Sequence, residues 1–270
     1  MSFPIHPSSS PAQPSPPMLR LSAGACTDVG AVRTENQDAF GVLPELAIGS
    51  GHAAGHVVPQ PAVFAVADGM GGHEAGAEAS TAAVEAMMDT FGPAFRTQSD
   101  RVALMSHAVT SANDAVWARA NTGPYRRQMG TTCTLLLIAD GHAFLGQVGD
   151  SRAYRIRGQK IEQLTTDHTM GEAARHDPSL AEIARTRSHH LTRAIGIRES
   201  VQVDAFSAGA VSPGDRYVLC SDGLAPVDLN EIVRAVHAYA PQEASNWLVA
   251  LASQLGSRDN ATAVVVQVVP

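Results

Sequence analysis

Apolar and polar positions divide the chain into strand-like and helix-like segments. The clearest is the run 63–67, Val-Phe-Ala-Val-Ala, which stops at Asp68 and is followed by a glycine-rich stretch. A continuous apolar run of this length predicts a strand that is buried on both faces. Residues 73–91 and 100–121 then have the composition and apolar spacing of helices. We therefore expect a strand, a bare glycine loop and a helix to meet around Asp68.

The same patterns predict the remaining elements. Short glycine-containing turns separate 131–139, 142–148 and 152–157, so these neighbours are expected to be antiparallel. Residues 44–61, rich in Gly, Ala, Pro and His, are expected to be a loop with solvated histidines. Other predicted strands are 18–28, 39–43, 160–164, 201–206, 215–220 and 261–268. Other predicted helices are 228–239 and 242–255, with short helical pieces in 168–188 broken at Asp177 and Pro178.

Strands in hairpin order and helices in pairs indicate the α+β class rather than alternating β-α-β units. We expect two packed antiparallel sheets with helices outside them. Residues 1–17 are mostly Pro and Ser, a composition that cannot bury a core, and predict a disordered tail. Residues 18–270 are then expected to form one domain.

Composition narrows the class of protein. The net charge of −7 argues against sequence-independent nucleic-acid binding. The cysteines Cys26, Cys133 and Cys220 are far apart, which favours core residues over a disulfide framework or a zinc site. No apolar run is long enough to span a membrane, and the first residues lack a signal-peptide pattern. We expect a cytoplasmic monomer.

Acidic residues recur where the apolar runs begin or end. Besides Asp68, they are Asp38, Asp150, Asp222 and Asp259. Taken singly, each is well explained as a turn or capping residue, as Asp140-Gly141 is by a two-residue hairpin turn. If the five converge, their carboxylates repel one another and raise each other's pKa unless cations hold them.

Eight segments, in this order, resemble the metal-dependent protein serine/threonine phosphatases of the PPM, or type 2C, family. The resemblance covers about residues 26–268, and the Met of Asp-Gly-Met-Gly-Gly is typical of the bacterial branch. The segments are Gly30-x-x-Arg33-x-x-Asn36-Gln37-Asp38, Ala67-Asp68-Gly69-Met70-Gly71-Gly72, Met129-Gly130-Thr131-Thr132, Val148-Gly149-Asp150-Ser151-Arg152-Ala153-Tyr154, Leu164-Thr165-Thr166-Asp167-His168, Leu191-Thr192-Arg193-Ala194-Ile195-Gly196, Cys220-Ser221-Asp222-Gly223-Leu224 and Asp259-Asn260-Ala261-Thr262.

The resemblance implies a four-layer α-β-β-α sandwich and hydrolysis of phosphoserine and phosphothreonine on proteins by direct attack of a metal-bridging water. It implies that the substrates are phosphorylated proteins, and that the enzyme opposes a bacterial Ser/Thr kinase in signal transduction. The implied cofactors are two tightly bound Mn²⁺ or Mg²⁺ ions, with a third that binds more weakly. All-oxygen ligation suits such hard cations.

The resemblance also implies a role for each candidate residue. Asp68 would bridge the two tight cations, with the Gly69 carbonyl as a further ligand. Asp222 and Asp259 would hold the second cation, and Asp38 would lie behind the first through water. The third cation would take Asp150 together with Asp222. Arg33 would bind the substrate phosphate, and Arg33, Asp38 and Asp68 form the implied catalytic set.

Simpler interpretations of single residues stay open. Arg33 is also explained by a surface ion pair, Asp38 by a turn, Asp259 by a cap, and Asp150 by a local ion pair with Arg152. Two departures from the family stand out. Met70 occupies a position where many eukaryotic members carry a His that is a candidate general acid. His189 and His190 end the segment 169–190, here called the flap, where bacterial relatives usually have an Asn.

Other classes of protein are less well supported. A phosphate-binding adaptor that keeps the fold without turnover would be expected to lack metal-binding acids, and none is missing. A nucleotide enzyme would need a phosphate loop such as G-x-x-x-x-G-K-[ST], which is absent. An aspartyl-phosphate phosphatase would need Asp-x-Asp after its first strand, also absent.

Overall fold

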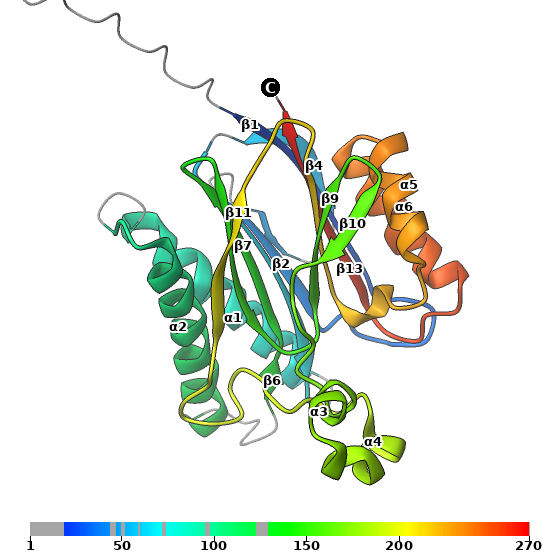
Figure 1. Ribbon diagram of the computed structural model, residues 1–270. Coiled ribbons are helices and arrows are strands. Elements are labelled where there is room, and N and C mark those ends of the chain that lie inside the picture. Colours follow the sequence, from blue (N-terminus) through cyan, green and yellow to red (C-terminus); the bar gives the residue numbers. More distant parts are fainter. Residues whose placement is uncertain are drawn as a thin grey trace, which may run out of the picture.

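Two antiparallel sheets packed face to face form the centre of the structure (Figure 1). The computed structural model describes residues 19–43, 47–49, 52–58, 60–71, 74–94, 98–122 and 129–269, without the side chains of 47–49, 52–58 and 93–94. The tail predicted at 1–17 lies outside the described residues.

The first sheet is six-stranded and the second seven-stranded. The first has the order β10 (Lys160–Gln163), β9 (Arg152–Arg157), β12 (Arg216–Cys220), β13 (Ala261–Val269), β1 (Arg20–Asp28) and β4 (His52–Val58). The second has the order β11 (Asp204–Ala210), β8 (His142–Val148), β7 (Cys133–Ala139), β5 (Ala62–Met70), β2 (Asp38–Leu43) and β3 (Ala47–Gly49), with β6 (Gly130–Thr131) pairing with β5.

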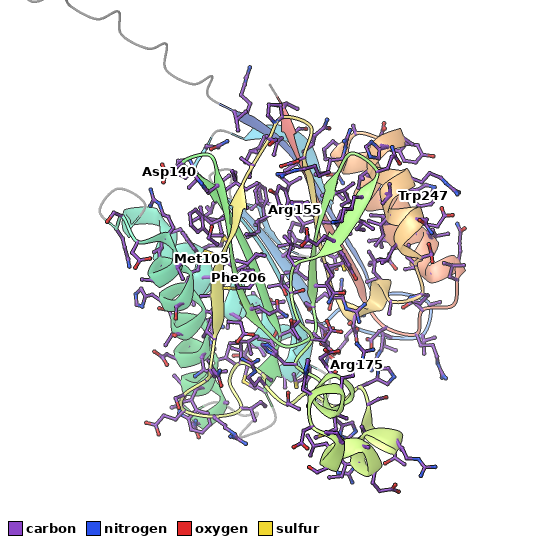
Figure 2. The ribbon with its side chains drawn as sticks, viewed as in Figure 1. Met105, Asp140, Arg155, Arg175, Phe206 and Trp247 are labelled. Atoms are coloured by element: carbon purple, nitrogen blue, oxygen red, sulfur yellow. The ribbon has the colours of Figure 1, made fainter. Side chains whose placement is uncertain are left out.

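Helix pairs cover the outer faces of both sheets, which confirms the predicted α-β-β-α sandwich. α1 (Glu74–Ala94) and α2 (Arg101–Thr122) pack on the second sheet, and α5 (Leu229–Ala238) and α6 (Pro241–Gln254) pack on the first. In Figure 2, Met105 of α2 and Trp247 of α6 mark these layers on opposite sides of the sheets. No helix of the described residues is long and apolar enough to cross a membrane.

Three hydrophobic clusters hold the layers together, because a sheet that is covered on both faces must bury both sets of side chains. In β5, Val63, Ala65 and Ala67 face the α1–α2 layer, while Phe64 and Val66 face the other sheet. The continuous apolar run therefore forms a doubly buried strand, as predicted. Cys26, Cys133 and Cys220 are buried and free, as expected of core residues.

The flap lies at one end of the sandwich, opposite the end that carries the chain's C-terminus (Figure 1). It consists of α3 (Met170–His176), the 3-10 turn η1 (Pro178–Leu180) and α4 (Ala181–Arg187). The Thr169 hydroxyl caps α3 by accepting a hydrogen bond from the Glu172 N–H, and Asp177 does the same for Ser179 at η1. The predicted breaks at Asp177 and Pro178 are confirmed.

Three predictions need correction. Residues 44–61 are not all loop, since β3 and β4 lie in this segment; pairing with β2 and β1 imposes strand geometry on a sequence with little β preference. The strand predicted at 201–206 begins at Asp204 and runs to Ala210. Most importantly, β8 and β9 are not neighbours: the chain crosses from the second sheet to the first at 149–151, because β9 pairs with β12 and β10.

Candidate active site

Five carboxylates gather at the end of the sandwich that faces the flap. Asp38 opens β2 and lies directly opposite Asp68 of β5, its partner in the antiparallel ladder. Asp150 follows β8, Asp222 opens the 3-10 turn η2 (Asp222–Leu224) after β12, and Asp259 precedes β13. The site therefore draws acids from both sheets.

A cavity of about 450 Å³, here called the catalytic cavity, brings the predicted residues together. Asp68, Gly69, Asp150, Asp222 and Asp259 line it. Other lining residues include Arg33, Gln37, Met70, Thr132 and, from the end of the flap, His189 and His190. Asp38 is the one predicted residue that does not line the cavity; it lies behind Asp68.

Asp38 is buried and only partly satisfied. Asp38 is 4% exposed. Its Oδ2 accepts hydrogen bonds of 2.7 Å from the Ser221 and Thr262 hydroxyls. Its Oδ1 is buried with no hydrogen-bond partner. Thr262 lies in β13 of the first sheet, and Ser221 directly follows β12 of the same sheet. Since Asp38 opens β2 of the second sheet, its carboxylate also ties the two sheets together. Because buried polar atoms normally have a partner, Asp38 Oδ1 is available to bind a cation or to accept a hydrogen bond.

Burial and mutual repulsion disfavour the ionised acids. Burial raises the pKa of Asp38 to about 7, and burial followed by repulsion from Asp222 raises the pKa of Asp150 to about 7. The pKa of Asp68 is raised well above its usual value by burial and then by Asp38. The pKa of Asp222 is raised by burial and by Asp259, while a hydrogen bond to Asp68 opposes the shift. Bound positive charge would favour the ionised form of each of these carboxylates, so the arrangement favours cation binding.

The backbone around Asp68 leaves no room for side chains. A Cβ at Gly69 would overlap the carbonyl oxygens of Gly76 and Gln37, and the Gly69 N–H donates to the Gln37 carbonyl at 3.0 Å. Thr132 fixes Asp68 from the other side: its N–H donates to the Asp68 carbonyl and its hydroxyl accepts from the Asp68 N–H, both at 2.9 Å. The Asp68 carboxylate is therefore held on a rigid strand end.

Arg33 forms an ion pair with Asp259, with 2.6 Å between Nη2 and Oδ2. The Arg33 side chain is 52% exposed, so its remaining N–H groups face solvent and the catalytic cavity. This ion pair is what the simpler interpretation of Arg33 predicted. The ion pair leaves other N–H groups of the Arg33 guanidinium free to bind a phosphate, because a guanidinium has five N–H donors.

Asp150 stands at the crossing between the sheets. Gly149 has a φ of +105°, and a Cβ there would overlap Thr132, so this position requires glycine. Arg152 pairs with Asp167, at 2.6 Å between Nη2 and Oδ2, and not with Asp150. The local ion pair considered for Asp150 is therefore absent, and Asp150 faces the cavity.

Comparison with known proteins gives the family. Residues 33–264 match the family described as Protein phosphatase 2C. The chain belongs to the protein phosphatase 2C family. It is 33% identical over 258 residues to the Mycobacterium tuberculosis serine/threonine protein phosphatase PstP, covering 93% of this chain but only 46% of that protein. The chain thus spans about half the length of this relative.

Two further comparisons agree. The chain is 32% identical to the Streptococcus pneumoniae protein phosphatase PhpP over 252 residues, covering 89% of this chain and 94% of that protein. The crystal structure of the PstP catalytic domain in complex with two manganese ions superposes with a TM-score of 0.76 at 32% identity, covering 93% of this chain and 100% of that one. The predicted family and fold are confirmed.

The acids of this protein phosphatase 2C site suit hard divalent cations. The donor set is all oxygen, and Asp38 Oδ1 is buried without a partner. Among the described residues, however, no group of three or more Asp, Glu, His or Cys side chains forms a compact ligand cage. Mg²⁺ usually binds proteins through one or two carboxylates and keeps several water ligands, so it does not require such a group.

Several supporting residues were not singled out from the sequence. They include Ser221 and Thr262, which hold Asp38, and His168, which is 3% exposed and whose Nδ1 accepts from the Gly149 N–H at 3.0 Å. Asn260 is another: its Oδ1 accepts from the Gln37 N–H and its Nδ2 donates to the Val29 and Glu35 carbonyls. Each of these residues lies in a segment that resembles the family. That resemblance is the only feature of the sequence that could have identified them.

Proposed function

We propose that this chain is a metal-dependent protein serine/threonine phosphatase. The observation that carries the proposal is the convergence of four acids from both sheets, with Arg33, on one cavity. Such a cluster costs folding free energy unless cations occupy it. The names of the relatives and the manganese-bound structure of PstP support the same activity.

We assign the cation ligands as the family resemblance implies. Asp68 would bridge two Mn²⁺ or Mg²⁺ ions with the Gly69 carbonyl beside it, Asp222 and Asp259 would hold the second ion, and Asp38 would lie behind the first. Asp150 would join Asp222 at a third, weaker site. When bound, the ions supply an activated water and clamp an in-line displacement at phosphorus.

The chain's own side chains bind and orient the substrate. Arg33 would hold the phosphate through its guanidinium fork, since its ion pair with Asp259 fixes one end and leaves the other free. Met70 lines the cavity and has no proton to donate. His189 and His190 line it from the flap, and their imidazole nitrogens can donate or accept hydrogen bonds there.

We further propose the setting in which the enzyme works. Residues 18–270 form one phosphatase domain preceded by a tail, active as a monomer in the cytoplasm. Its substrates are phosphorylated proteins, including a bacterial Ser/Thr kinase and that kinase's targets in signal transduction. The support for this part is the family and the names of the bacterial relatives.

Removing and restoring metal tests the proposal. Purified protein should hydrolyse phosphothreonine peptides with Mn²⁺ or Mg²⁺, lose this activity on exhaustive chelation, and regain it on reconstitution. Asp222→Asn should remove most turnover while its melting temperature in chelator stays close to that of the wild type. Full activity after chelation would contradict a metal-dependent reaction. A chain that binds phosphopeptides but never turns them over would support the adaptor class instead.

A further inference from the structure

A second cavity, of about 600 Å³, adjoins the catalytic one. Val32 to Glu35, Gln37, Gly71 and Arg258 line it, and we call it the flanking cavity. Arg33, Gln37 and Gly71 also line the catalytic cavity, so the two share a wall. A peptide whose phosphorylated residue enters the catalytic cavity can therefore place a neighbouring residue in the flanking cavity.

The wall of the flanking cavity is held in place before any ligand binds. Asn260 is 3% exposed, and its side-chain amide bonds three backbone groups of the 29–37 loop at 2.8–2.9 Å. Gln37 Nε2 donates to the Gly71 carbonyl at 3.2 Å. Since Arg258 lies two residues before Asn260, the same anchor fixes the backbone from which Arg258 projects. Binding to such a preformed site loses little conformational entropy.

The flanking cavity offers an acidic group one guanidinium, that of Arg258, which is not already paired among the described residues. It contains two guanidinium groups, Arg33 and Arg258, and one carboxylate, Glu35. Arg33 is paired with Asp259, whereas Arg258 is exposed and makes no ion pair or side-chain hydrogen bond within the described part of the chain. Val32, 53% exposed, offers apolar surface beside it for the methylene stem of a side chain.

We propose that the flanking cavity is a specificity subsite in which Arg258 binds an acidic group, a carboxylate or a second phosphate, carried by a residue close to the phosphoserine or phosphothreonine. A planar guanidinium matches both groups because each presents two or more oxygens to its fork. The inference rests on the proposed phosphatase function and adds a substrate preference to it. Glu35 opposes the preference and limits its size.

Paired substrates and matched variants test the subsite. Phosphothreonine peptides would carry Ala, Glu, phosphoserine or Lys at each of the three positions on either side. We expect Glu at one position to lower KM about two- to fivefold relative to Ala, the range of an exposed ion pair, with little change in kcat. A second phosphate there should lower KM further, and this comparison separates the two sources of negative charge.

The variants give opposite results if the assignment is correct. Arg258→Gln should remove the advantage of the acid, and Glu35→Gln should enlarge it. Arg20→Gln is the matched control, because Arg20 is exposed at the far end of β1 from the 29–37 loop and should leave the preference unchanged. All variants should hydrolyse p-nitrophenyl phosphate as the wild type does, since it is too small to reach the flanking cavity.

The outcomes separate this inference from the phosphatase proposal. An acid advantage at no position, or one that survives Arg258→Gln, would overturn the subsite while leaving the activity standing. A preference for Lys that Glu35→Gln removes would show that the cavity takes basic residues instead. If no substrate is hydrolysed, the phosphatase proposal fails, and fluorescence anisotropy with phosphonate analogues of the same peptides still measures whether Arg258 selects acids.

Discussion

Without divalent metal, the carboxylate cluster should make the protein less stable as the pH rises. Burial raises the pKa of Asp38 to about 7 from an ordinary value of 3.8, so between these values the folded state binds a proton that the unfolded state has lost. The free energy of unfolding therefore falls with increasing pH across this window. From pH 5 to 7, Asp38 alone should account for a loss of about 2–3 kcal/mol.

Denaturant unfolding in chelator at pH 5, 6, 7 and 8 measures this loss. Other groups titrate in the same range; burial lowers the pKa of His168, for example, which acts in the opposite direction. The difference between the wild type and Asp38→Asn gives the contribution of Asp38 together with its coupling to Asp68, because contributions from groups outside the carboxylate cluster cancel. Asp89→Asn makes the same chemical change on the exposed surface of α1 and should leave the pH dependence as it is.

Saturating Mn²⁺ should raise the stability of the wild type and remove most of its pH dependence above pH 6, since bound cations favour the ionised carboxylates. A free energy of unfolding in chelator that is constant or rises from pH 5 to 7 would refute the reasoning. So would a pH dependence that Asp38→Asn leaves intact.

Four further predictions concern the reaction and its supports. Arg33→Ala should lower kcat/KM on a phosphothreonine peptide about tenfold or more through loss of a charge-assisted contact; wild-type kinetics would exclude phosphate binding by Arg33. Asp150→Ala should keep the wild-type melting temperature and calorimetric binding of two tight Mn²⁺ ions yet lose most activity, and activity loss that merely follows unfolding would contradict this. His168→Phe should cost about 1–3 kcal/mol in denaturant unfolding, because the buried Gly149 N–H loses its acceptor; an unchanged stability would show that water replaces it. Phosphothreonine peptides should be hydrolysed faster than phosphotyrosine peptides in steady-state assays, and the reverse order would contradict the substrate class.

The layers of the fold were predictable from the sequence because the local spacing of apolar and polar residues determines which segments form buried strands and covering helices. The run that ends at Asp68 is doubly buried in β5, and the paired helices fall close to their predicted bounds. The partner of a strand is decided by tertiary packing instead. A short glycine turn between β8 and β9 looks like a hairpin, yet Gly149 at a φ of +105° sends the chain to the other sheet. Likewise β4 exists because β1 offers an edge to pair with.

The acids of the candidate site were also predictable, as carboxylates at strand ends, but their supports were not. Thr262 lies within an apolar run and Ser221 directly follows one, and nothing in the local sequence shows that their hydroxyls meet Asp38, more than 180 residues away in the chain. Arg152 shows the same limit: sequence proximity suggests Asp150 as its partner, while the fold supplies Asp167. Long-range hydrogen bonds depend on the three-dimensional arrangement and leave no periodicity to detect.

The division of the carboxylates between two sheets has a consequence for the assembly of the fold. Asp38 and Asp68 come from the second sheet, and Asp222 and Asp259 adjoin strands of the first, so neither sheet alone contains the candidate site. Chains of this size commonly fold through partly assembled intermediates. Such an intermediate would lack the complete candidate site. Cation binding would then add stability only to the fully packed sandwich, because the candidate ligands converge only there.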